Sequence, residues 1–130
     1  DKNSLYNTPP VFPIYAMNLV LKRMKANGGL SAMSEHNNKK SGLLYSTFEN
    51  SNGYYRSPVD AKYRSDMNVV FRLPSEDLEK KFIEEAAAEK MYGLKGHRSV
   101  GGCRASIYNS MTIEGVEKLI SFMKDFASKN

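Results

Sequence analysis

Four basic side chains and three glycines fall within ten consecutive positions in the last third of the sequence, and together they could bind an anion. The basic residues are Lys95, His97, Arg98 and Arg104. An arginine guanidinium binds a carboxylate or phosphate through paired hydrogen bonds, and glycine lets a backbone turn tightly or approach a ligand. The segment therefore predicts a loop that grips a small molecule with two negative groups. An ordinary surface loop with solvated basic side chains is the alternative that these residue types leave open.

Residues for other common kinds of site are scarce. The single cysteine, Cys103, excludes an internal disulfide and is typical of a reducing compartment. His36 and His97 fall in separate predicted elements, so neither a zinc site nor a Cys–His nucleophile pair is supported. The glycines match neither the Walker nor the Rossmann spacing. On the residues alone, we interpret the chain as a binding half that lacks catalytic machinery.

Composition and charge narrow the class of protein further. The 130 residues are 41% hydrophobic, which is ordinary for a globular domain, and the net charge of +5 favours acidic partners. The lysines are dispersed: the adjacent pairs, at 39–40 and 80–81, both fall on helix faces that we expect to be exposed. A nucleic-acid binder would show a basic stripe with interleaved aromatics, and a membrane span would need a much longer apolar run. We therefore expect one compact domain with neither a nucleic acid nor a membrane as partner.

The start of the chain contains a second group of possible ligand-binding residues. Asn7 and Thr8 precede two consecutive prolines, which force an extended path. Their polar side chains would then lie on a stiff segment and could donate hydrogen bonds. A simple turn before a helix is the other interpretation of the same residues.

Apolar spacing predicts two helices in the first half of the chain. The first begins at Pro13 and stops at Gly28-Gly29, where glycine can end a helix. One face of it should be apolar and consists of Ile14, Met17, Leu21 and Met24. The second helix runs from about residue 31 to residue 49. Its middle, at 35–41, is polar, and we expect it, including His36, to be solvated.

The remaining elements are predicted from alternation and capping. Strands are expected at 54–57, 67–73 and 103–108, where apolar and polar residues alternate. Ser75 and Thr112 are suitable N-caps for two further helices, one to about residue 91 and one to the end of the chain. If Ala105 and Ile107 face the core, Arg104 lies on the opposite face of its strand. The order predicts an α/β fold of the α+β kind, a small sheet with helices packed on it.

Three motifs resemble those of the phosphoserine aminotransferases, which are pyridoxal-phosphate enzymes of the fold-type I, class V group. They are N-T-P-P at 7–10, R-S-x-M-N-V at 64–69 and G-H-R-S-V-G-G-x-R-A-S-I-Y-N at 96–109. The similarity extends through T-I-E-G-V-E-K-L at 112–119. The resemblance implies serine biosynthesis by amino transfer from glutamate to 3-phosphohydroxypyruvate, which gives O-phosphoserine and 2-oxoglutarate.

The resemblance also implies a fold and a set of partners. The fold is that of the aspartate-aminotransferase-like transferases dependent on pyridoxal phosphate, with this chain as the C-terminal portion. Residues 1–12 would end the large cofactor domain, 13–29 would form a connecting helix, and 30–130 would form the small substrate-binding domain. The N-terminal part of the same enzyme and a second copy, in a homodimer, would be its protein partners. A cytoplasmic location is expected, or a plastid if the source is a plant or alga.

Residue roles carry over from the family position by position. His97 and Arg98 match positions that hold the phosphate of the substrate or the side-chain carboxylate of glutamate. Arg104 matches the arginine that forms a two-pronged salt bridge with the α-carboxylate. Asn7 and Thr8 match the pair that reaches the cofactor phosphate of the partner subunit.

Several parts of the family's catalytic machinery have no match in these residues. The lysine that forms the Schiff base, the aspartate that pairs with the pyridine nitrogen and the aromatic that stacks on the ring would all precede residue 1. We interpret Lys95 as solvated or ion-paired, so we expect no catalytic residue and no metal in this chain, and no activity from it alone. The alternatives are another class V aminotransferase, or a non-catalytic anion-binding module if the natural chain begins at residue 1.

Overall fold

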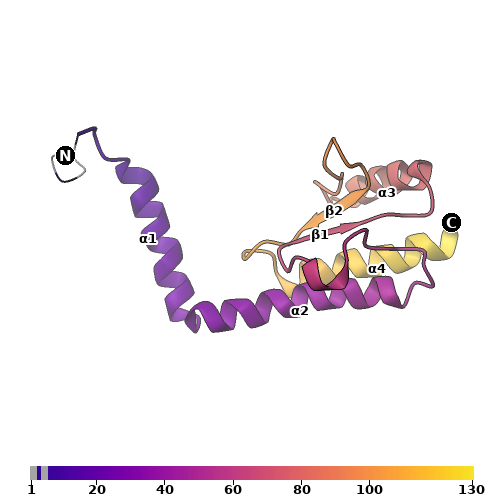
Figure 1. The fold of residues 1–130 in the computed structure, drawn as a ribbon, viewed down its shortest axis with the longest axis horizontal. Helices are drawn as coiled ribbons and strands as arrows, with labels where there is room; N and C mark the ends of the chain where they lie inside the picture. The colour runs from indigo at the N-terminus through magenta and orange to yellow at the C-terminus, as the bar shows by residue number, and fades with distance from the viewer. Residues whose placement is uncertain (1–2, 4–5) are drawn as a thin grey trace. The chain divides into compact units, whose positions relative to one another are not determined.

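The computed structural model describes residue 3 and residues 6–130, and the chain falls into two compact units (Figure 1). The first unit extends to Glu35 and the second comprises His36–Asn130. Each unit is considered separately below. The boundary lies within one continuous helix, α2, at Gly29–Glu49.

The first unit is dominated by helix α1, Val11–Ala26. It begins two residues before the predicted start, so Pro13 lies in the first turn, where a missing N–H removes no helical hydrogen bond. At its other end, Gly28 and Gly29 adopt φ angles of 95° and 72°. These angles are easily reached only by glycine, and they separate α1 from α2 as predicted.

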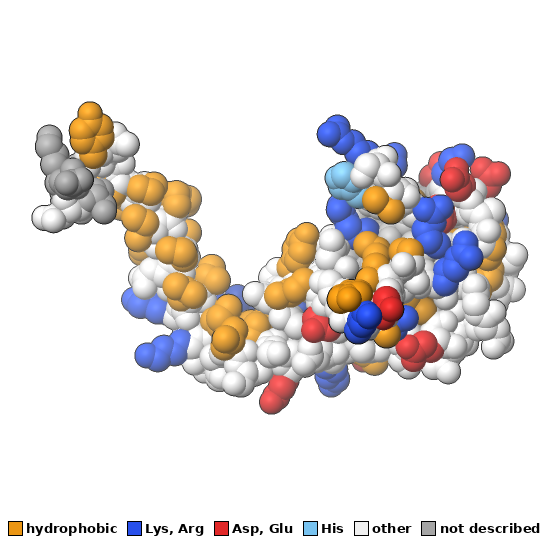
Figure 2. Space-filling model, viewed as in Figure 1, with side chains coloured by type: hydrophobic (Ala, Val, Ile, Leu, Met, Phe, Trp, Pro, Cys, Tyr) orange, Lys and Arg blue, Asp and Glu red, His pale blue; other side chains and the backbone are white. Residues whose placement is uncertain are grey.

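The residues of the predicted apolar face of α1 are not buried within this unit. No residue of α1 is buried, and Ile14, Met17 and Leu21 are each about half exposed. Figure 2 shows hydrophobic side chains gathered along this helix. The reason is that apolar residues occur all around α1, and the described residues of its unit form no sheet on which one face could pack. The further exposed apolar residues of this helix are Val11, Phe12, Tyr15, Leu19 and Val20.

The second unit is built on a two-stranded antiparallel sheet. Its strands are β1, Asn68–Phe71, and β2, Cys103–Ser106, with Val70 opposite Arg104. Both strands alternate between buried and half-buried residues, as predicted. The strand expected at 54–57 is reduced to one isolated bridge, between Arg56 and Arg72, because Pro58 cannot extend the ladder.

Three helices of this unit lie around the sheet (Figure 1), and an aromatic cluster joins them to one face of it. Phe71 on β1 contacts Phe48 of α2 at a ring separation of 5.3 Å and Phe82 at 5.7 Å. Phe82 belongs to α3, Glu76–Ala88, and its ring lies 5.2 Å from that of Phe126 in α4, Ile113–Lys129. A strand residue points to one face only, so these contacts place α2, α3 and α4 on the same side. The short 3-10 helix η2, Ala61–Tyr63, connects α2 to the sheet.

Both predicted N-caps of this unit are confirmed. The Ser75 hydroxyl accepts a hydrogen bond from the Leu78 N–H at 3.2 Å, and the Thr112 hydroxyl accepts one from the Gly115 N–H at 3.1 Å. The inward face of α4 is also as expected, with Val116, Leu119, Ile120, Met123 and Phe126 all buried. Across residues 3 and 6–130, no helix has both the length and the apolar character needed to cross a bilayer.

The polar middle of α2 departs from prediction, because much of it is buried. Lys40 is 0% exposed, and its ammonium donates to the carbonyls of Ile107 at 2.9 Å and Tyr108 at 2.7 Å. His36 is half-buried, and its Nε2 lies 3.2 Å from the Met111 carbonyl, so it is not simply solvated. The physical reason is that α2 packs here against the polar backbone that follows β2. Asn37 and Ser41 are buried in the same stretch.

Candidate anion-binding site

The glycine-rich segment forms a closed loop that extends strand β2. Its ends are joined by hydrogen bonds from the Gly96 N–H to the Gly102 carbonyl and from the Arg104 N–H to the Leu94 carbonyl, each 2.8 Å. A bridge between Lys95 and Cys103 lies between them. Both ends of the loop are therefore fixed by backbone hydrogen bonds next to β2.

Glycine is required at three points of this loop. A Cβ on Gly96 would clash with the carbonyl oxygen of Gly101. Gly101 and Gly102 have φ angles of 75° and 72°, in the left-handed region. The glycines thus allow the backbone to fold back on itself and bring its two sides within hydrogen-bonding distance.

His97 and Arg98 lie at the tip of the loop. The His97 carbonyl accepts hydrogen bonds from the N–H groups of Val100 at 2.9 Å and Gly101 at 2.8 Å, which makes a tight turn. The His97 Nδ1 accepts the Ser99 N–H at 3.3 Å and lies 2.7 Å from the Ser99 hydroxyl. With Nδ1 used as an acceptor, the neutral imidazole carries its proton on Nε2. Both side chains are exposed, so the tip presents an imidazole N–H and a guanidinium to solvent.

Arg104 lies on the face of the sheet opposite the core, as alternation predicted. Ala105 and Ile107 are 2% and 3% exposed and face the core, whereas Arg104 is half-buried. Its Nε is buried and has no hydrogen-bond partner among the residues that the structure describes. A buried donor without a partner costs about 1–3 kcal/mol, so an acceptor from outside these residues is expected.

Asn7 and Thr8 belong to the first unit, whereas the loop belongs to the second. Both side chains are exposed, and in the described part of the chain neither has a hydrogen-bond partner. The amide of Asn7 and the hydroxyl of Thr8 are donors of the kind that a phosphate accepts.

Two further residues support the loop and were not predicted from the sequence. Arg72 follows β1, and its Nε lies 2.7 Å from the carboxylate of Glu79 on α3. Its Nη1 also donates to the Val100 carbonyl in the loop at 3.1 Å. The alternating pattern marked Arg72 as outward-facing but carried no sign of a partner in the helix beyond Pro74.

Other candidate chemistries find no support in the geometry. Cys103 is 1% exposed, and burial raises the pKa of its thiol to about 12, so it is not a nucleophile near neutral pH. Lys95 is exposed. Within residues 3 and 6–130, no cluster of three or more His, Cys, Asp or Glu residues could hold a metal ion.

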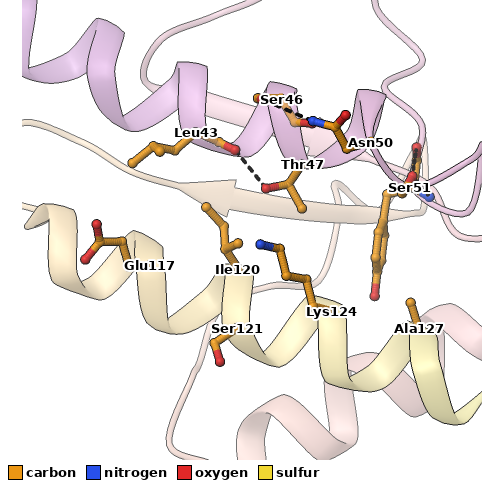
Figure 3. Close-up of a pocket in the computed structure, with 11 residues that line it drawn as sticks. Leu43, Ser46, Thr47, Asn50, Ser51, Glu117, Ile120, Ser121, Lys124 and Ala127 are labelled. Atoms are coloured by element: carbon orange, nitrogen blue, oxygen red, sulfur yellow. Dashed lines mark hydrogen bonds between the residues drawn. The ribbon is translucent and has the colours of Figure 1, made fainter.

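A cleft between α2 and α4 is separate from the predicted site residues (Figure 3). Several of its polar groups are satisfied within α2 itself. The Thr47 hydroxyl donates to the Leu43 carbonyl at 2.8 Å, and the Asn50 amide donates to the Ser46 carbonyl at 2.8 Å. None of the site residues predicted from the sequence lines this cleft, so the loop remains the candidate site.

Comparison with known proteins gives a consistent picture. Residues 1–119 match the family described as aminotransferase class-V. The chain is 57% identical, over 98% of its length, to phosphoserine aminotransferase from Herpetosiphon aurantiacus. It also resembles the solved structure of phosphoserine aminotransferase from Bacillus circulans subsp. alkalophilus, with a TM-score of 0.95, 52% identity and 98% of this chain covered.

A third similar protein was solved with its cofactor. The structure of phosphoserine aminotransferase with bound pyridoxal phosphate from Trichomonas vaginalis matches 95% of this chain, with a TM-score of 0.86 and 38% identity. The chain spans 35% of the length of each of these three proteins. The predicted fold, a small sheet with packed helices as found in these enzymes, is confirmed.

Proposed function

The chain belongs to the class-V aminotransferase family, and we propose that it is the C-terminal, substrate-binding part of a phosphoserine aminotransferase. The complete enzyme would transfer an amino group from glutamate to 3-phosphohydroxypyruvate and produce O-phosphoserine and 2-oxoglutarate. High identity over nearly the whole chain to proteins of that name supports the proposal. In this assignment, residues 1–12 complete the large domain, 13–29 connect, and 30–130 form the small domain.

The observation that carries the proposal is the buried Nε of Arg104, on the sheet face opposite the core, which has no hydrogen-bond partner among the described residues. We assign Arg104 to the α-carboxylate that every substrate of the reaction carries. A guanidinium offers paired donors in a plane, which is the geometry that a carboxylate accepts best. The Nε donor that lacks an acceptor in this chain would be satisfied by the substrate.

His97 and Arg98 would bind the other end of the same substrate. Phosphoserine and 3-phosphohydroxypyruvate end in a phosphate, and glutamate and 2-oxoglutarate end in a carboxylate. One imidazole and one guanidinium can bind either group, because their N–H groups can donate hydrogen bonds to the oxygens of a phosphate or of a carboxylate. Their exposure at the loop tip leaves both side chains available for this contact.

The donor chemistry near the start of the chain fits pyridoxal phosphate. Asn7 and Thr8 would hold the phosphate of the cofactor bound to the partner subunit of a homodimer, through donors that are exposed and without a partner among the described residues. When bound, the cofactor supplies the electron-withdrawing ring that amino transfer requires. The residues of this chain bind and orient the substrate, and we assign the proton transfers to the remainder of the enzyme.

Replacing Arg104 by lysine in the complete enzyme tests the proposal. We expect kcat/KM to fall about 10- to 100-fold for glutamate and phosphoserine alike, because a point charge replaces a two-pronged donor worth about 1.5–3 kcal/mol. The measurement is steady-state amino transfer between glutamate and 3-phosphohydroxypyruvate. Arg56→Lys, at an exposed arginine next to the sheet, is the control and should change little. A wild-type enzyme that does not transfer an amino group to 3-phosphohydroxypyruvate would refute the proposed function.

A further inference from the structure

Arg72 contacts the candidate substrate loop directly and lies between that loop and helix α3. Its Nη1 donates to the Val100 carbonyl at 3.1 Å, three residues beyond His97. On its other side, Nε lies 2.7 Å from the Glu79 Oε1. The side chain is 27% exposed, so it is largely enclosed by these neighbours.

Glu79 is fixed in place and so can hold Arg72 in one orientation. Its side chain is 7% exposed, and Oε1 also accepts the Leu73 N–H at 3.3 Å. The carboxylate lies near the beginning of α3, where the helix dipole favours a negative charge. A second carboxylate, Glu76, lies 4.0 Å from Arg72 but is 80% exposed, so it contributes little.

The loop backbone also packs closely against the side chain of Arg72, in addition to the hydrogen bond that Val100 accepts from it. A Cβ on Gly102 would lie 2.7 Å from the Arg72 Cδ, and one on Gly101 would lie 3.4 Å from Nη1. The loop backbone therefore packs on the arginine, and at Gly102 a side chain would displace it. Close packing and a hydrogen bond together hold residues 100–102 of the loop against Arg72.

We propose that Arg72, oriented by Glu79, is a positioning residue that sets where His97 and Arg98 present their donors. The inference rests on the proposed function, because it is through these two residues that the enzyme would bind the distal anion of its substrate. Displacing the Val100 carbonyl moves the turn in which the His97 carbonyl accepts the Val100 N–H. Arg104, held in the β2 ladder opposite Val70, keeps its place. Arg72 and Glu79 therefore affect binding of the distal anion of the substrate and leave binding of the α-carboxylate unchanged.

The test compares a substrate that has a distal anion with one that lacks it, in the complete enzyme. In Arg72→Lys, one ammonium cannot reproduce the fork that serves Glu79 and Val100 together. We expect KM for phosphoserine to rise about tenfold, which corresponds to a loss of about 1.4 kcal/mol of binding free energy. The value of kcat should stay within twofold of wild type. Single-turnover kcat/KM for L-alanine should stay within twofold of wild type. Glu79→Gln should show the same pattern more weakly, and Arg56→Lys, at an exposed arginine, should show none of it.

A second readout does not depend on the reaction. Trypsin can cut after Arg98, and a loosened loop should be cut there faster in Arg72→Lys than in wild type or Arg56→Lys, with mass spectrometry identifying the cut. Equal losses for phosphoserine and alanine, or an unchanged KM for phosphoserine, would overturn the positioning role. If wild type fails to use phosphoserine, the proposed function falls, and the cleavage rate alone then decides whether Arg72 positions the loop. In that case, equal cleavage rates in Arg72→Lys and wild type would refute this inference as well.

Discussion

Lys40 shows how a charged side chain can be buried with backbone carbonyls as its hydrogen-bond partners. Its ammonium is fully enclosed and donates to two consecutive backbone carbonyls just beyond β2. Carbonyl dipoles partly replace the water that the ion loses, and the remaining desolvation lowers the pKa of Lys40. The side chain thereby ties α2 to the end of the strand that carries Arg104. This contact places a polar stripe of α2 inside the unit, where the sequence pattern alone suggested solvent.

The buried thiol of Cys103 gives a pH-dependent stability with a definite sign. Burial raises the pKa of this thiol from 9.0 to about 12, so the folded state keeps a proton that the unfolded state loses. Between pH 9 and 12 the free energy of unfolding should therefore fall, by at most about 1.4 kcal/mol per pH unit from this group. The measurement is urea unfolding of wild type and Cys103→Ala from pH 8 to pH 10.5.

The comparison separates the thiol from Tyr45 and Tyr54, whose raised pKa values do not depend on Cys103. Burial raises the pKa values of these two tyrosines, which lowers stability at high pH in wild type and variant alike. The two stability curves should converge as pH rises above 9. Curves that stay parallel through pH 10.5 would show that Cys103 does not have the raised pKa.

At the scale of elements, the closed loop depends on a glycine where the backbone crosses itself. In Gly96→Ala the new methyl group would meet the Gly101 carbonyl, so the loop cannot close as it does now. We expect a loss of about 1–3 kcal/mol of stability, the range for overpacking, and weaker binding of phosphoserine. Thermal unfolding and KM for phosphoserine in the complete enzyme measure the two effects.

Gly42 provides the matched control for that substitution. It lies in α2 with no atom within 4 Å of an added Cβ. Gly42→Ala should raise stability by up to about 1 kcal/mol, because alanine favours a helix over glycine. A Gly96→Ala enzyme no less stable than wild type, measured beside Gly42→Ala, would contradict the crossing at Gly96.

Elements that local sequence controls could be predicted, and those that distant contacts control could not. The Ser75 and Thr112 caps depend on residues three positions away, and alternation placed Arg104 opposite the core side of β2. The burial of Lys40 depends on a segment 67 residues further along the chain, which no periodicity encodes. The Arg72–Glu79 pair likewise depends on how α3 folds back on β1.

At the scale of the whole molecule, α1 is the feature that a free-standing domain would not explain. Its apolar side chains, among them Phe12 at 78% and Val11 at 68% exposed, form a surface that water disfavours. Relatives of this chain are about three times as long, since it spans 35% of the lengths of those compared. This supports the proposal that the chain works as part of a longer protein, whose remaining residues would cover α1.

At this scale, both proposed anion-binding groups lie on one hairpin of the second unit. Arg104 lies within β2, which the sheet holds rigidly, whereas His97 and Arg98 lie on a loop that glycines allow to turn. A substrate with an anion at each end would be bound by both groups. A substrate with only an α-carboxylate would be bound by Arg104 alone.

The most direct test of this division is the substrate dependence of Arg98→Ala in the complete enzyme, measured as single-turnover kcat/KM for phosphoserine, glutamate and L-alanine. We predict a fall of about 10- to 100-fold for phosphoserine and glutamate, because each loses a charged hydrogen bond to its distal anion, and a change within twofold for alanine. Equal losses on all three substrates would contradict the assignment of the loop tip to the distal anion and, with it, the account of this chain as a two-ended substrate grip.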